Sequence, residues 1–160
     1  MFRKISQKDI GDIKTPEEAY NYAKDIGKPV PELESIIAED SVWSLYYAED
    51  IIKGRFKEGE KTIVQSPEWS YEYAKDVIKG RFEEGEKAIA RNPAWSYEYA
   101  ENVIQCRFEE GEKTIAQDPI YSYLYAVNVI KGRFEEGEKV LIQSPEWGKK
   151  YAKEFGLEEF

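Results

Sequence analysis

The arrangement of apolar and charged positions along this chain repeats every 26 residues. Between Trp69 and Ile78, aromatic, aliphatic and small residues recur at intervals of three and four, which is the spacing of one helix face. At 100° per residue these positions cover an arc of about 200°, and Glu68, Glu72 and Lys75 lie on the opposite side. The pattern predicts an amphipathic helix of about 12 residues whose apolar face touches more than one neighbour.

A second, shorter helix is predicted from Phe82 to Ala90, with a narrow apolar stripe that includes Gly85 and Ile89. A helix this short is marginal in isolation, so it must pack against the first. A glycine recurs inside the stripe in four units, at Gly59, Gly85, Gly111 and Gly137. Each costs about 1 kcal/mol relative to alanine, so we expect it to make room for an aromatic ring or a crossing helix.

Capping signals mark both ends of the first helix. A residue that can cap a helix precedes proline in five places, at Thr15, Ser66, Asn92, Asp118 and Ser144. At the other end a left-handed glycine is predicted at Gly54, Gly80 and Gly132. Cys106 stands in that place in one unit, which predicts strain of about 1–2 kcal/mol and a higher Tm for Cys106→Gly.

The repeat divides the chain into units. Residues 40–143 hold four regular two-helix repeats, 40–65, 66–91, 92–117 and 118–143. Residues 15–39 fit the frame with one deletion as a divergent capping repeat, and residues 144–160 form a C-terminal half-repeat cap. Residues 1–14 form a basic N-terminal lead segment. Such units bury their apolar faces by stacking, so the sequence predicts an all-α solenoid.

The repeated letters Y-x-Y-A-x-x-V-I-K-G-R-F-E-E-G-E-K resemble a short helical-hairpin repeat found in proteins of bacteriophages and other large viruses. The resemblance covers about residues 15–152. It implies an all-α repeat fold and a viral, intracellular origin, and it implies no reaction. The period is shorter than the roughly 33–34 residues of ankyrin and tetratricopeptide repeats, so their peptide-binding habits do not follow.

Charge narrows the expected partners. The net charge is −9, of which residues 1–14 contribute +2, leaving −11 for the rest of the chain. Because nucleic-acid binding depends on neutralising phosphates, binding along this acidic body is not expected. No apolar run approaches the roughly 20 residues of a membrane span, so no membrane association is expected. A single cysteine fits a reducing compartment, and a soluble cytoplasmic protein is the expectation.

Catalytic chemistry finds little support in the sequence. The chain has no histidine, the commonest general acid–base near neutral pH, and the lone cysteine has no base partner. Metal-ligand spacings and glycine-rich phosphate loops are also missing. We therefore predict no catalytic residue, no metal site and no cofactor, and expect that the protein is not an enzyme.

An arginine and a glutamate recur in each regular unit. The arginines are Arg55, Arg81, Arg107 and Arg133, and the glutamates are Glu60, Glu86, Glu112 and Glu138. One interpretation is an Arg–Glu pair, within or between units, that fixes the stacking register. The other is a row of arginines that faces a groove and binds phosphate or carboxylate.

Aromatic and acidic rows offer further candidate surfaces. Trp43, Trp69, Trp95, Tyr121 and Trp147 mark one edge of the apolar arc and are expected in the core, whereas Tyr71, Tyr97 and Tyr123 mark the other edge and are either core or binding residues. Glu83, Glu84, Glu109, Glu110, Glu135 and Glu136 form a predicted acidic ridge on the second helices. The ridge is either a solvated face or a surface for a basic partner.

The leading hypothesis is a non-enzymatic helical-repeat interaction protein of viral origin, which binds a host protein in the host cytoplasm and inhibits or redirects it. One alternative is an acidic nucleic-acid mimic that blocks a DNA- or RNA-binding enzyme. Another alternative is a sponge for a nucleotide-type small ligand, held by the recurring arginines and tyrosines. The sequence leaves open the oligomeric state and the face that binds.

Overall fold

A computed structural model describes residues 10–158, while residues 1–9 and 159–160 lie outside the described residues. Most of the basic lead segment and Phe160 of the C-terminal tail therefore have no structural account. Within the described range the chain forms helices and turns without a β-strand, and helix pairs follow one another with a period near 26 residues. This confirms the predicted all-α solenoid.

The helices form two rows. The first-row helices are α1 (Pro16–Ile26), α3 (Ser41–Tyr46), α5 (Pro67–Glu72), α7 (Pro93–Glu98), α9 (Pro119–Leu124) and α11 (Pro145–Phe155). The second-row helices are α2 (Pro31–Ile37), α4 (Glu60–Ile63), α6 (Glu83–Ile89), α8 (Glu109–Ile115) and α10 (Glu135–Ile142). A short 3-10 helix, η1 (Ile10–Asp12), precedes them.

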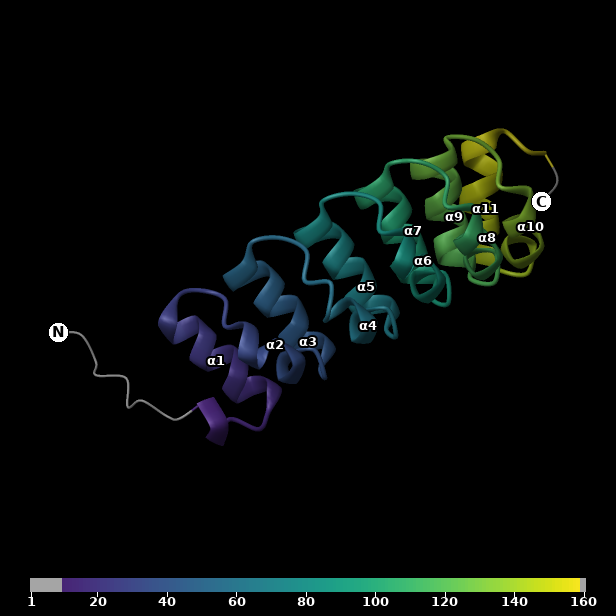
Figure 1. The fold of residues 1–160 in the computed structure, drawn as a ribbon. Helices are drawn as coiled ribbons and strands as arrows, with labels where there is room; N and C mark the ends of the chain where they lie inside the picture. The colour runs from purple at the N-terminus through teal and green to yellow at the C-terminus, as the bar shows by residue number, and fades with distance from the viewer. Residues whose placement is uncertain (1–9, 159–160) are drawn as a thin grey trace.

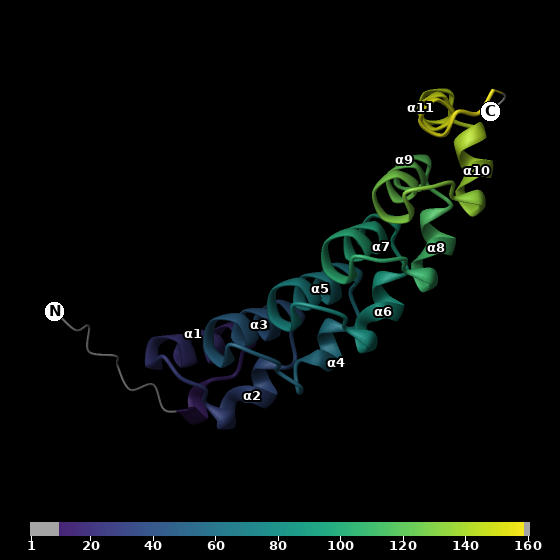
Figure 2. The ribbon, with the colours of Figure 1, turned by 90° about the horizontal axis from the view of Figure 1, so that it is seen from above.

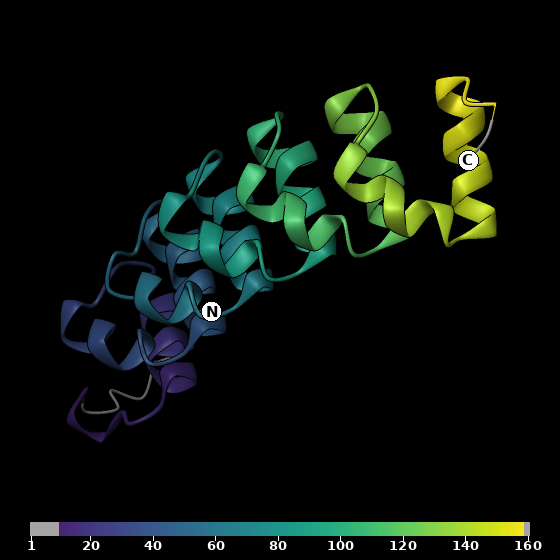
Figure 3. The same cartoon turned by 90° about the vertical axis from the view of Figure 1, so that its right-hand side faces the viewer.

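Stacking the pairs produces a curved molecule. Figure 1 shows the units in sequence order from one end of the stack to the other. Viewed from above, the stack bends into an arc, with the first-row helices along its inner side and the second-row helices along its outer side (Figure 2). Figure 3 shows the same succession of helix pairs from the C-terminal side. The first-row helices therefore supply the concave face.

The predicted N-caps explain where the first-row helices begin. The Ser66 hydroxyl accepts the Trp69 N–H at 3.4 Å, and the Asn92 side chain accepts the N–H groups of Ala94 and Trp95. The side chains of Thr15, Asp40 and Asp118 do the same in their units, whereas that of Ser144 makes no capping hydrogen bond. The capping prediction is thus confirmed except at the last helix.

A π-helical turn completes the first helix of each regular unit. These turns are η2 (Tyr47–Ile52), η3 (Tyr73–Ile78), η4 (Tyr99–Ile104) and η5 (Tyr125–Ile130). A π turn accommodates one more residue than an α-helical path of the same length. In α1 and α11, which are α-helical throughout, Gly27 and Gly156 end the helix 12 positions after the N-cap, against 13 in the regular units, as from Ser66 to Lys79. The one-residue deletion in the first unit is the missing π residue.

The glycine assignment at the helix ends is wrong for the regular units. The left-handed residue is the one before the glycine: Lys53, Lys79, Gln105 and Lys131 have φ of 58°, 57°, 51° and 55°. The helix ends one residue earlier than expected because the N–H of Gly80 bonds back to the carbonyl of Ala74, which places the left-handed turn at Lys79. Cys106 therefore occupies no left-handed position, and the predicted strain there has no basis.

The glycines of the second-row helices have a steric reason. A Cβ added at Gly85 would lie 2.5 Å from the Phe82 ring and 3.0 Å from the Ser70 Cβ. Phe82 is the N-cap residue of the same short helix, and Ser70 belongs to the first-row helix that it crosses. The prediction that these glycines make room for an aromatic ring or a crossing helix is confirmed on both counts.

Candidate functional site

The recurring arginines lie in a network that crosses from one unit to the next. Arg55 forms a two-point pair with Glu60 of its own unit, Nε to Oε1 at 2.7 Å and Nη2 to Oε2 at 2.8 Å. Tyr73 of the following unit donates its hydroxyl to Glu60 Oε1 at 3.0 Å and accepts the N–H of Phe56 at 2.7 Å. One buried hydroxyl therefore joins the backbone and the carboxylate of the preceding unit.

The same arrangement returns at later junctions. Tyr99 bonds to Phe82 and Glu86, Tyr125 to Phe108 and Glu112, and Tyr151 to Phe134 and Glu138. Arg81, Arg107 and Arg133 pair with Glu86, Glu112 and Glu138. At the first junction Tyr47 bonds to the Val30 N–H and the Glu34 carboxylate. The Arg–Glu pairs therefore lie within units, and a tyrosine of the following unit binds each glutamate, which is the arrangement expected if the pairs fix the stacking register.

The network shifts the ionisation of its members. Burial raises the pKa of the Glu60 carboxyl, but hydrogen bonds from Arg55 and Tyr73 outweigh burial and leave that pKa below its ordinary value. The balance is the same for the pKa of Glu112, with Arg107 and Tyr125 as partners. Burial raises the pKa of Tyr73. These glutamates therefore stay charged and these tyrosines protonated near neutral pH.

These pairs weaken the hypothesis that the recurring arginines bind a ligand. All four candidates, Arg55, Arg81, Arg107 and Arg133, hold a glutamate of their own unit. Arg81 and Arg107 do line a cleft of about 400 Å³, but Glu86, Glu109 and Glu110 line it with them. A phosphate entering this cleft would meet carboxylates as well as guanidinium groups, which offers little to a nucleotide.

The candidate tyrosines lie within the stack. Tyr71 and Tyr97 are buried and Tyr123 is half-buried. Tyr71 stacks on Trp95 of the next unit with ring centroids 5.2 Å apart, and Tyr123 packs against Trp147 at 5.5 Å. The two aromatic edges of the arc meet because neighbouring first-row helices turn opposite edges toward each other. Two of the three tyrosines therefore present little surface to a partner.

The acidic ridge is exposed. Glu83, Glu84, Glu109, Glu110, Glu135 and Glu136 all lie in the first turn of their second-row helix and face solvent. The ridge runs beside the arginine row, and Glu84 accepts from Arg55 of the preceding unit at 2.9 Å. Interleaved arginines weaken the resemblance to a phosphate backbone, which carries a continuous line of negative charge.

The inner face of the first-row helices carries residues that the sequence analysis did not single out. Ser70 and Ala74 face the second row and are fully buried, so Glu68, Glu72 and Lys75 lie on the side turned toward the inside of the arc. The residues at the Glu72 position are Tyr46, Glu72, Glu98, Leu124 and Lys150, one period apart. The residue type at these positions varies between units while most of the unit repeats, and this variation could have identified the face from the sequence.

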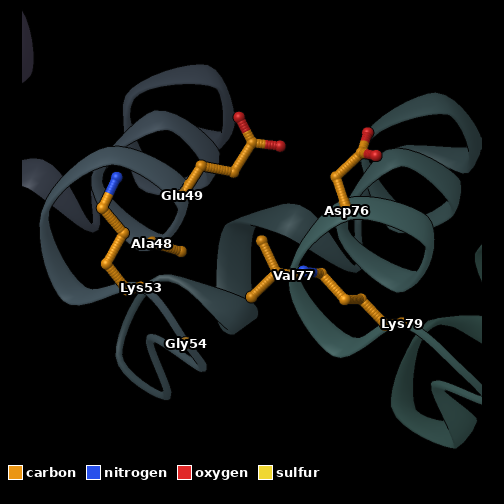
Figure 4. Close-up of a pocket in the computed structure, with 7 residues that line it drawn as sticks. All are labelled: Ala48, Glu49, Lys53, Gly54, Asp76, Val77 and Lys79. Carbon is orange, nitrogen blue, oxygen red and sulfur yellow. The ribbon is translucent and has the colours of Figure 1, made fainter.

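One hollow lies between η2 and η3. It has a volume of about 660 Å³ and is lined by Ala48, Glu49, Lys53, Gly54, Asp76, Val77 and Lys79. Figure 4 shows the Glu49 side chain extending from one π-helical turn toward the other, which carries Asp76. Burial and the charge of Asp76 raise the pKa of Glu49. The hollow is open to solvent, and Lys75 lies 3.5 Å from Asp76.

Comparison of the chain with protein-family models, with curated proteins and with solved structures finds no match. The resemblance to viral helical-hairpin repeats therefore stays a prediction. In the described part of the chain, no group of three or more His, Cys, Asp or Glu side chains could hold a metal ion. None of the helices in residues 10–158 is long and apolar enough to cross a membrane.

Proposed function

We propose that the protein is a non-enzymatic helical-repeat module that binds a protein partner on the concave face of its first-row helices. The observation that carries this proposal is the division of labour within each unit. Tyr73, Phe82, Gly85 and Glu86 recur in each regular unit and are buried in contacts that hold the stack together. A residue that repeats because the scaffold needs it cannot by itself distinguish one partner from another.

The inner face differs from unit to unit, and the interunit hydrogen-bond network does not use its side chains. At the positions of Glu72 and Lys75 the chain varies between acidic, basic, aromatic and aliphatic side chains. Solenoids use their concave surfaces in this way, since the per-repeat rotation creates an extended surface of fixed shape. The curvature in Figure 2 provides that surface here. The partner is proposed to be a host protein that this module inhibits or redirects, which the resemblance to viral repeats supports.

Site-specific photocrosslinking tests this proposal. A photoreactive amino acid placed at Glu72 on the inner face, and separately at Glu109 on the outer acidic ridge, is used in nuclease-treated lysate of the presumed host. We expect a discrete crosslinked protein from the Glu72 position and none from Glu109. Crosslinking from Glu109 alone moves the binding surface to the ridge and favours mimicry of a nucleic acid. No crosslink from either position contradicts the proposal.

A further inference from the structure

The inner face of the fourth regular unit, residues 118–143, differs from that of the other units. Between Pro119 and Ile130, α9 and η5 contain no charged residue, whereas each of the other first-row helices, taken with the π turn that follows it where there is one, carries at least two. Ile120, Leu124 and Val127 occupy the places that Glu68, Glu72 and Lys75 hold two periods earlier. We name these three residues the apolar stripe.

The apolar stripe is accessible. Ile120 is 41% exposed, and it is one of four exposed large hydrophobic residues in the described part of the chain. Leu124 and Val127 are half-buried, with the spacing of four and three that places all three side chains along one line of the helix. Exposed apolar side chains that gather in a line on a surface otherwise rich in charge mark an interaction site.

The two flanks of the stripe have opposite charge. On one side, α7 and η4 carry Glu98 and Glu101 and no basic residue. On the other side, α11 presents Lys150 and Lys153, both exposed. Lys150 already pairs with Glu146 at 2.8 Å, but both side chains are exposed, and a surface pair of this kind is weak enough to exchange for another partner.

The shape of the inner face selects the occupant. In Figure 2 the first-row helices are seen nearly end-on along the inner side of the arc, so the concave face curves across the helix axes and is straight along them. A cylinder fits a face of this shape when it lies along α9, and an α-helix is a cylinder about 10–12 Å across. A second copy of this chain fits poorly, because two concave arcs placed face to face meet at their ends.

We propose that the apolar stripe and its flanks bind an amphipathic α-helix of the partner protein, lying along α9. Its apolar residues, spaced i, i+3 or i+4, and i+7, pack on the stripe. Lysine or arginine on one edge of that helix faces Glu98 and Glu101, and aspartate or glutamate on the other edge faces Lys150 and Lys153. This inference rests on the proposed function and specifies the partner that one part of the concave face recognises.

Designed helical peptides test the inference directly. Three labelled peptides share one leucine face: the first has lysines on one edge and glutamates on the other, the second glutamates on both edges, and the third lysines on both. Fluorescence anisotropy is measured at low and moderate salt. We expect the mixed peptide to bind roughly tenfold more tightly than either control. Equal binding of all three, or binding of none, overturns the proposal.

A variant that copies another unit tests the stripe with side chains that the stack already carries elsewhere. Leu124→Glu with Val127→Lys gives the fourth unit the residue types found at Glu72 and Lys75 in the second unit. Because Leu124 also packs against the core, we expect a lower Tm, and in the variant shown by circular dichroism to be folded, a loss of mixed-peptide binding of roughly tenfold or more. The matched control, Glu83→Gln with Glu109→Gln on the exposed outer ridge, is expected to bind as the parent does. Unchanged binding by the Leu124 variant refutes the site.

Charge reversal tests the flank. With Glu98→Lys and Glu101→Lys both flanks are basic, so the preference is expected to move to the peptide with glutamates on both edges. A preference that stays with the mixed peptide contradicts the assignment of this flank. Light scattering of the free protein completes the set, because a dimer that Leu124→Glu dissociates would identify a second copy as the occupant and overturn the helix proposal.

Failure of this inference is distinguishable from failure of the proposed function. If the Glu72 position crosslinks to a partner whose binding the Leu124 variant leaves unchanged, the concave face binds elsewhere and the apolar stripe is not its helix site. If neither the crosslinking position nor the peptides reports binding, both proposals fall together.

Discussion

The hydroxyl of Tyr73 accepts the backbone N–H of Phe56 at 2.7 Å, across the boundary between two repeat units. Phe56 lies just before the start of a short second-row helix, and its ring fills the place that Gly59 leaves open. The same hydroxyl donates to Glu60. A single side chain of one unit therefore fixes the position of the next, and its repetition accounts for much of the identity between units.

Removing that hydroxyl is expected to destabilise the stack. Tyr73→Phe leaves the buried N–H of Phe56 without its acceptor and takes one donor from Glu60, at a cost of about 1–3 kcal/mol in the free energy of unfolding. The matched control is Tyr46→Phe on a neighbouring first-row helix, where the side chain is 39% exposed and a change near zero is expected. Urea unfolding followed by circular dichroism measures both. Equal stability of the two variants would show that the Tyr73 hydrogen bonds do not stabilise the stack.

Glycines in two places should respond differently to alanine. Gly85→Ala places a methyl group 2.5 Å from the Phe82 ring, so overpacking of about 1–3 kcal/mol outweighs the gain in helix propensity. Around Gly80 a Cβ meets no atom within 4 Å, so Gly80→Ala is expected to change Tm little. Thermal unfolding of the pair separates a steric requirement from a general preference for glycine. A larger loss at Gly80 would contradict the packing described here.

Relief of the left-handed residues is expected to stabilise the protein. Lys79 has a φ of 57°, which costs a non-glycine residue about 1–2 kcal/mol, so Lys79→Gly should raise stability by about 0.5–1 kcal/mol after the added chain entropy. Cys106→Gly should leave Tm unchanged or lower it, because Gln105 carries the positive φ in that unit. Differential scanning calorimetry compares the two, and a rise for Cys106→Gly alone would restore the original glycine assignment.

Acid is expected to weaken the stack through its buried glutamates. Hydrogen bonds to Arg and Tyr, acting against burial, lower the pKa values of Glu60 and Glu112 below the ordinary 4.5. A lowered native pKa contributes stability that is complete above pH 4.5 and is lost as pH falls through the native value. Unfolding free energies from pH 7 to about pH 3 should therefore fall, and less steeply in Glu60→Gln with Glu112→Gln. Equal slopes in the parent and in the double variant would contradict this role of the two glutamates.

The architecture could be predicted from the sequence because the same packing residues recur in each unit of a solenoid. The proline after each predicted N-cap and the glycine beside Phe82 each predict a local structure that is present in the fold. The π-helical turn could not be predicted, since Tyr73 and Val77 keep helical spacing whether the turn is α or π. The left-handed position shifted by one residue for the same reason, from Gly80 to Lys79.

The candidate site was harder to predict than the fold. Tyr71 and Tyr73 are the same residue type two positions apart, and their roles depend on which edge of the helix contacts the next unit. The sequence does distinguish the two positions. The Tyr73 position is tyrosine in every unit up to Tyr151, whereas the Tyr71 position is occupied by Leu45 and Lys149 in other units. Identification of the inner face required the curvature of the stack, which no single unit encodes.

The central claim is that repeated residues hold the stack while the varied inner face binds. The most direct test measures the affinity of the crosslinked partner for two variants that circular dichroism shows to be folded, Leu124→Glu with Glu72→Gln on the inner face and Glu83→Gln with Glu109→Gln on the outer ridge. We expect the inner-face variant to lose roughly tenfold or more in affinity and the ridge variant to stay within about twofold of the parent. A loss confined to the ridge variant would contradict the account.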